Sequence, residues 1–252
     1  MPDEPTSFPQ PSPEQRLRDN LDAIRQRIQD ACARAGRSSD AVTLVAVSKT
    51  HSVDTIRALF DAGQREFGES YVQEWQDKTT QLSDPKYSDI RWHFIGHLQS
   101  NKARFISEKI ALIHSVDRKS VLKSLQKSAD APIDVLLQVN VGNQASKGGV
   151  APDGVIQFLK TALGYADIRV CGLMCIPPYV DDPEDNRGYF RQMRELFERA
   201  HAWLGEQEDG DLSAHFRYLS MGMSGDFEVA IEEGATHIRV GTALFGARDY
   251  DR

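Results

Sequence analysis

Eight short apolar runs alternate with helix-like segments along this chain, and that alternation limits the possible folds more than any other feature. Strands alternating with helices are typical of parallel β/α units, and eight is the number at which such a sheet closes into a barrel. The predicted strands are Val42–Val47, Glu66–Gly68, Trp92–Gly96, Leu112–Val116, Val135–Val141, Val170–Ile176, Tyr218–Met221 and Ile238–Leu244. The predicted helices between them are Val53–Ala62, Tyr71–Thr80, Asn101–Ser107, Lys119–Ser128, Pro152–Leu163, Asp185–Leu204 and Gly225–Glu233.

The predicted fold class is therefore α/β, as a single TIM-like (β/α)8 barrel. An open doubly wound sheet is the structural alternative, but no glycine fingerprint of a dinucleotide site follows the first strand. An extra helix is expected before the barrel, because apolar residues recur at spacings of three and four from Glu14 to Ala35 and Gly36 ends the pattern. Residues 1–13 are acidic and rich in proline, so we expect a disordered tail at 1–13 and the barrel domain at 14–252.

Charge and cysteine content restrict the partners and the compartment. A formal net charge of −7 is unfavourable for a sequence-independent grip on nucleic acid, which needs a basic face. The N-terminus does not resemble a secretory signal, and no apolar run approaches the roughly 18 residues of a membrane helix. The three cysteines form neither a disulfide framework nor a zinc motif, and the histidines have no metal-ligand spacing. We expect a cytoplasmic protein with no nucleic-acid partner, no membrane partner and no metal.

Lys49 ends the apolar run that begins the barrel. Active sites of such barrels lie at the C-terminal ends of the strands, where this lysine is expected. A lysine that is desolvated there, or lies near another cation, can attack a carbonyl group as a neutral amine. The alternative is a strand-end lysine whose charge extends into water.

Small residues near the ends of the last two predicted strands suit a phosphate group. Ser224 and Gly225 follow the seventh strand, and Ser224 is the expected N-cap of a helix whose first N–H groups can bind an anion. Near the end of the eighth strand, Gly241 permits close approach of the backbone and Thr242 offers a hydroxyl. Each pair alone is typical of turns and caps. Because loops after strands seven and eight frequently bind phosphate, together they predict a phosphate held opposite Lys49.

Arg239 lies inside the last apolar run. If it points into the barrel, its permanently charged guanidinium can donate a hydrogen bond to a ligand. A structural ion pair with Glu66 or Glu69 is the alternative. A lysine that forms a Schiff base, a phosphate cradle and an arginine donor together describe a site for pyridoxal 5′-phosphate.

Five segments that carry these residues closely resemble the pyridoxal phosphate homeostasis protein family. They are Val45–Thr50, Phe67–Glu74, Trp92–Lys102, Gly172–Met174 and Leu219–Ser224, and the resemblance extends from about Arg16 to Ala247. It implies a monomeric barrel of fold type III, similar to the N-terminal domain of alanine racemase, with Lys49 as the aldimine lysine.

The resemblance also implies the remaining site residues. Ser224, Gly241 and Thr242 would hold the phosphate, and Arg239 would face the pyridine nitrogen. Gly225 belongs to the same phosphate loop. Many relatives have asparagine at the position of Ser70, so a contact near the ring is in doubt there. Met221 is expected either to line the pocket or to pack in the core.

Two function classes follow for a pyridoxal phosphate protein, and a third does without the cofactor. The first is a non-catalytic carrier that stores the cofactor, buffers it and delivers it to apoenzymes. The second is an amino-acid racemase, which needs an acid or base on each face of the substrate carbanion. The resemblance implies a tyrosine from a further domain as the second base, whereas this chain ends soon after the eighth strand, so we favour the carrier. A lysine-dependent aldolase acting on a sugar phosphate is the third. Lys147 is either a second amine for the cofactor or an exposed loop charge.

Overall fold

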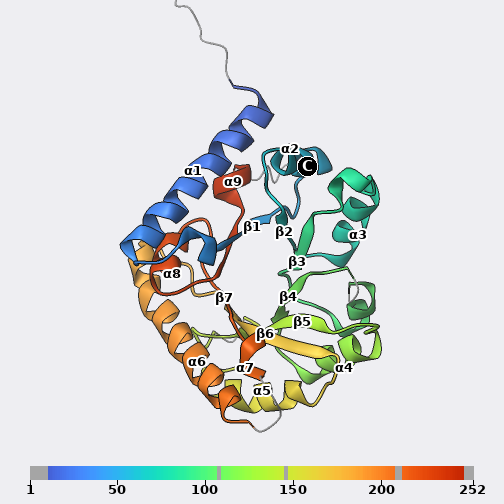
Figure 1. Cartoon of the computed structure of the whole chain (residues 1–252), viewed down its shortest axis with the longest axis vertical. Coiled ribbons are helices and arrows are strands. Elements are labelled where there is room, and N and C mark those ends of the chain that lie inside the picture. The colour runs from blue at the N-terminus through green and yellow to red at the C-terminus, as the bar shows by residue number, and fades with distance from the viewer. Residues whose placement is uncertain (1–10, 107–108, 145–146, 208–211, 247–252) are drawn as a thin grey trace, which may run out of the picture.

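The computed structural model describes residues 11–106, 109–144, 147–207 and 212–246 of the chain. Their strands form a closed parallel barrel in the order of the sequence, and helices surround it (Figure 1). The strands are β1 (Thr43–Val47), β2 (Glu66–Glu69), β3 (Arg91–Phe94), β4 (Leu112–Val116), β5 (Ile133–Val139), β6 (Ile168–Cys175), β7 (Tyr218–Ser220) and β8 (His237–Val240). The predicted (β/α)8 barrel is confirmed, and the doubly wound alternative is wrong.

The barrel closes between its first and last strands. Parallel pairing places Thr43 of β1 opposite His237 of β8 and Val45 opposite Arg239. Strands of such a barrel are covered by helices on the outside and by packed side chains on the inside, so both faces are buried. That is why β1 reads as an unbroken apolar run, with Val45 and Ala46 fully buried.

Helices cover the outside of the barrel. The α-helices are α1 (Pro13–Arg34), α2 (Val53–Asp61), α3 (Val72–Gln81), α4 (Lys119–Lys127), α5 (Val155–Leu163), α6 (Arg187–Gly205), α7 (Leu212–His215), α8 (Phe227–Glu232) and α9 (Thr242–Phe245). Short 3-10 helices are η1 (Ser39–Ala41), η2 (Pro85–Tyr87), η3 (Ser100–Phe105), η4 (Pro152–Gly154) and η5 (Pro183–Asn186). The predicted extra helix is α1, which packs against α2, α8 and α9 (Figure 1).

The last predicted strand, Ile238–Leu244, is wrong over its second half. β8 ends at Val240, and Thr242–Phe245 forms the short helix α9. Gly241 turns the chain with φ −113° and ψ −84°, and its carbonyl oxygen then accepts the N–H groups of Leu244 and Phe245. A short apolar run cannot be told from a short buried helix by periodicity, because both consist of apolar residues only.

The start of α1 allows a direct test of its cap. Residues 1–10 of the predicted tail lie outside the described residues, Ser12 is the N-cap and Pro13 begins the helix. The Ser12 hydroxyl accepts the N–H of Gln15 at 3.1 Å. We expect Ser12→Ala to lower the free energy of unfolding by about 1 kcal/mol, because an N–H at the helix start loses its acceptor. Urea denaturation checks this, with Ser12→Asp as the control that keeps an acceptor; equal losses in both variants would contradict it.

No helix of the described residues combines the length and the apolar character that a membrane crossing requires. The three cysteines are buried and unbridged. Burial raises the pKa of Cys171 and of Cys175 to about 12, so both remain neutral thiols at neutral pH.

Candidate functional site

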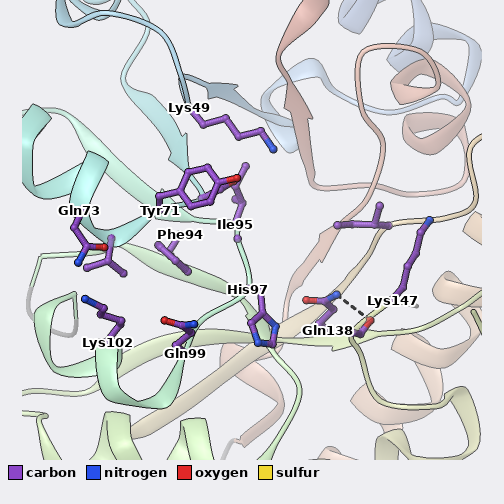
Figure 2. Close-up of a pocket in the computed structure, with 15 residues that line it drawn as sticks. Lys49, Tyr71, Gln73, Phe94, Ile95, His97, Gln99, Lys102, Gln138 and Lys147 are labelled. Carbon is purple, nitrogen blue, oxygen red and sulfur yellow. Dashed lines mark hydrogen bonds between the residues drawn. The ribbon is translucent and has the colours of Figure 1, made fainter. Parts of the chain in front are cut away.

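Two cavities lie where the strands end. The larger, of about 560 Å³, is shown in Figure 2, and the smaller has about 390 Å³. The larger cavity is lined by Lys49, Ser70, Tyr71, Val72, Gln73, Phe94, Ile95, Gly96, His97, Gln99, Lys102, Gln138, Lys147, Gly148 and Ile176. The smaller cavity is lined by Pro178, Tyr179, Val180, Asp181, Pro183, Asn186, Met223, Ser224, Gly225, Asp226, Arg239, Gly241 and Thr242.

The predicted site residues divide between these two cavities. Lys49 and Ser70 line the larger one, whereas the phosphate loops and Arg239 line the smaller one. The β1–β8 pair links the residues of the two cavities. A Cβ atom built on Gly241 would lie 3.6 Å from Cβ of Val47, which is only two residues before Lys49. The closed barrel therefore brings the lysine and the phosphate loops together from opposite ends of the chain.

Lys49 is half-buried and extends into the larger cavity, on the side where the ring of Tyr71 lies (Figure 2). The segment on either side of it is held rigidly. Ser48 is fully buried, and its hydroxyl donates to Glu69 Oε1 at 2.7 Å. Thr50 adopts a left-handed backbone with φ 69°, which is uncommon for a β-branched residue. Its N–H donates to Glu74 Oε1 at 2.5 Å.

A second lysine, Lys78, holds the segment around Lys49 by hydrogen bonds. Its buried ammonium donates to the backbone oxygen of Ser48 at 2.7 Å, to Glu69 Oε1 at 2.7 Å and to Glu74 Oε1 at 2.6 Å. Lys78 was missed in the sequence because a glutamate and a lysine four residues apart are usual on an exposed helix face. The pair Glu74–Lys78 was the only local signal, and it does not indicate burial.

Glu69 is the buried acid of this cluster. Burial raises the pKa of its carboxyl above the ordinary value, and the Lys78 ammonium opposes that rise. Its Oε1 accepts from both Ser48 and Lys78, whereas its Oε2 has no hydrogen-bond partner among the described residues. The arrangement depends on Lys78, because an ionised carboxylate without a cation is costly to bury.

Ser224 does not cap the helix that follows it, so that prediction is wrong. Asp226 occupies the N-cap position of α8. The Ser224 hydroxyl instead crosses to the next loop and accepts the N–H groups of Gly241 and Ala243, each at 3.2 Å. These two N–H groups converge on one point, which is the geometry in which backbone amides bind an anion. The sequence could not show this, because the partners lie 17 and 19 residues away.

Arg239 is buried, with 4% of its surface exposed, and lines the smaller cavity. Its Nη1 donates to Ser220 Oγ at 2.6 Å, and its Nη2 donates to the backbone oxygen of Cys175 at 2.8 Å. Among the described residues, no ion pair joins Arg239 to Glu66 or Glu69, so the structural ion-pair alternative is wrong. Burial lowers the pKa of Arg239 from its ordinary value, but a guanidinium stays protonated at neutral pH.

The other candidates fall into three groups. Gly225 and Thr242 line the smaller cavity with Ser224. Met221 is fully buried in the hydrophobic core and lines neither cavity. Lys147 lines the larger cavity and donates to the backbone oxygen of Pro177 at 2.7 Å, so its amine is engaged with the protein. In the part of the chain that the structure describes, no group of three His, Cys, Asp or Glu side chains is placed to hold a metal ion.

These residues suit a small aldehyde that carries a phosphate and a ring nitrogen. Lys49 supplies an amine, the loops of Ser224 and Gly241 supply converging N–H groups, and Arg239 supplies a fixed donor. A Cβ on Gly225 would meet no atom within 4 Å, so the protein's own packing leaves space at that loop.

Comparison with known proteins identifies the family. Residues 20–249 match the model of the alanine racemase N-terminal domain. The pyridoxal phosphate homeostasis protein of Aquifex aeolicus is 43% identical over 235 residues, which cover 92% of this chain and 98% of that protein. PipY of Synechococcus elongatus, solved with PLP bound, is 33% identical with a TM-score of 0.76 and covers 91% of this chain and 100% of its own.

Alanine racemase from E. faecalis shares the fold alone, at 16% identity and a TM-score of 0.60, over 90% of this chain and 58% of its own. The likeness to the Aquifex aeolicus homeostasis protein and to PipY covers nearly the whole of this chain and of theirs, at more than twice that identity. The protein belongs to the pyridoxal phosphate homeostasis protein family, within the larger family of alanine racemase N-terminal domains.

Proposed function

We propose that this protein binds pyridoxal 5′-phosphate at Lys49 and takes part in its homeostasis by storage, buffering and delivery, without robust catalysis. The observation that supports the proposal is the β1–β8 pairing, in which Arg239 lies opposite Val45 and Gly241 approaches Val47, two residues before Lys49. When bound, pyridoxal phosphate supplies an aldehyde that condenses reversibly with a primary amine. The relatives support the same reading, because one is solved with PLP and others are named for its homeostasis.

Each residue of the proposed site has a separate task. Lys49 presents its amine from a backbone that Lys78 and Glu74 hold in place. The N–H groups of Gly241 and Ala243, which converge on the Ser224 hydroxyl, would hold the phosphate together with that hydroxyl. Arg239 can donate to a ring nitrogen but cannot give up its proton there, so the ring stays neutral and is a weak electron sink. This combination suits holding a cofactor better than it suits carbanion chemistry.

We also propose partners, an oligomeric state and a cellular location for the protein. Apoenzymes that require pyridoxal phosphate would receive it, because a reversible bond to Lys49 lets an acceptor lysine compete for the same aldehyde. We also propose that the protein is monomeric and works in the cytoplasm, where its buried thiols stay reduced.

The binding experiment compares pyridoxal phosphate with pyridoxal, which lacks the phosphate. We expect near-visible absorbance to saturate with pyridoxal phosphate, and we expect pyridoxal to bind about 100-fold more weakly, since it forgoes about two charge-assisted hydrogen bonds. Equal affinities would contradict the phosphate site. A protein that remains colourless would contradict the whole proposal and favour the aldolase. Racemisation of alanine at a rate comparable to that of a racemase would favour the enzyme instead.

A further inference from the structure

A continuous line of hydrogen bonds crosses the barrel interior and ends on Arg239. Glu66 Oε2 lies 2.7 Å from His93 Nε2, and His93 Nδ1 lies 2.9 Å from His114 Nε2. His114 Nδ1 lies 2.9 Å from Ser220 Oγ, which accepts from Arg239 Nη1 at 2.6 Å. The line connects β2, β3, β4, β7 and β8, and Glu66, its far end, is the first residue of β2.

The chemistry of the end groups gives this line a direction. Glu66 also pairs with Arg91, whose Nε lies 3.1 Å from Oε1, so Glu66 acts as a carboxylate that only accepts. Arg239, at the other end, only donates. Burial lowers the pKa of His114 well below its ordinary value, and the positive charge of Arg239 lowers it further, so the ring of His114 is neutral.

One arrangement of hydrogens satisfies every contact of this line and leaves Arg239 as the only cation in the line. His93 carries its hydrogen on Nε2 and donates to Glu66, and His114 carries its hydrogen on Nε2 and donates to His93. Ser220 then donates to His114 Nδ1 and keeps a lone pair for Arg239. Each group donates once toward Glu66, so the hydroxyl of Ser220 cannot turn its hydrogen toward the guanidinium.

We propose that Glu66, His93, His114 and Ser220 are positioning residues for Arg239, which form a one-way hydrogen-bond chain that fixes where its guanidinium donates into the pocket. Ser220 and the Cys175 oxygen hold the two terminal nitrogens, which fixes the plane of the guanidinium. Arg239 itself lines the smaller cavity. This inference rests on the proposed function for the identity of the ligand. The hydrogen-bond chain itself is present in the protein without any ligand.

His237 provides a matched control within the same interior. It is buried, and burial lowers its pKa to about 3, so it is also neutral. Its ring lies 5.9 Å from that of His93, 6.0 Å from that of His114 and 4.7 Å from that of Tyr218. Its Nδ1 lies 3.0 Å from Thr236 Oγ1, so it is not a link in the chain. Replacing it removes a buried imidazole and leaves the chain intact.

The first test measures the hydrogens on the rings without any cofactor. In protein labelled with ¹⁵N-histidine, nitrogen chemical shifts at neutral pH report which ring nitrogen carries the hydrogen. We expect Nε2–H on both His93 and His114. A hydrogen on Nδ1 of His114 would overturn the direction of the chain, and this result does not depend on whether pyridoxal phosphate binds.

The second test measures the effect at the pocket. Ser220→Ala is expected to raise the dissociation constant for pyridoxal phosphate about tenfold, the size of one lost hydrogen bond to a charged group. His114→Phe should also raise this dissociation constant, and it should change how the absorbance of the bound form depends on pH. His237→Phe should do neither. Thermal denaturation checks that both phenylalanine variants are folded. If the two variants then have equal effects, the hydrogen-bond chain contributes only core packing, and the proposal is wrong. If wild-type protein binds no pyridoxal phosphate, the proposed function fails instead.

Discussion

Replacing Lys49 by alanine is expected to reduce covalent labelling by pyridoxal phosphate to background. The reason is that Lys49 extends into the cavity just after the end of β1, and β1 pairs with β8, which carries Arg239 and leads into Gly241. Borohydride reduction makes the lysine bond permanent, so the labelled peptide can be identified by mass spectrometry. The near-visible absorbance of the mixture should fall in parallel, because it reports the same bond.

Lys102 is the matched control for that experiment. It lines the same cavity as Lys49 but lies on η3, away from the β1–β8 pair (Figure 2). Lys102→Ala should keep the label on Lys49. Label that persists in Lys49→Ala, or that maps to Lys102 or Lys147 in the wild type, would show that another amine is the attachment point. Phosphate binding alone could then still be tested with the pyridoxal comparison.

Lys78→Met is expected to lower the free energy of unfolding by about 3–5 kcal/mol, because it leaves the Glu69 carboxylate buried without its cation. The substitution also removes the hydrogen bond from Lys78 to the backbone oxygen of Ser48, so the backbone next to Lys49 is less well held in place. We therefore expect weaker pyridoxal phosphate binding in the same variant. Urea denaturation measures the first effect and absorbance titration the second.

Lys86 is the control for Lys78, because it is a lysine in an ion pair that is exposed to solvent. Its amine lies 2.7 Å from Asp61 Oδ1, but both side chains are about half exposed. Lys86→Met should change neither stability nor binding noticeably, since exposed ion pairs contribute little. Adding Glu69→Gln to Lys78→Met should recover part of the lost stability by removing the uncompensated charge. A Lys78→Met protein as stable as the Lys86 variant would contradict the buried cluster.

The sequence predicted the barrel, which the structure confirms, and it named candidate site residues near the ends of the strands. Eight apolar runs in alternation with helices specify parallel strands, and the barrel fold fixes which end of each strand carries the site. Lys49, Ser224 and Thr242 were identified because each lies near the end of a predicted strand, and Arg239 because it is a charged residue inside an apolar run. This inference needs only local periodicity and the order of elements.

Other features were wrong or missed because they depend on contacts between distant residues. The Ser224 hydroxyl could have capped its own helix, and only the approach of the β8 loop gives it two other donors. His93 is noticeable in the sequence only as a histidine inside a strand. Its place in a chain to Arg239 depends on the contact of His114 with Ser220, which are 106 residues apart.

The sequence by itself thus determined the type of each element, their order and the strand ends at which chemistry is possible. The tertiary structure alone decided which buried polar groups meet: Lys78 with Glu69 under the Lys49 segment, and Ser220 with Arg239 at the pocket. The physical reason is that periodicity records whether a side chain faces water, whereas a hydrogen bond between buried groups depends on distance and direction between strands. Those are set only when the barrel closes.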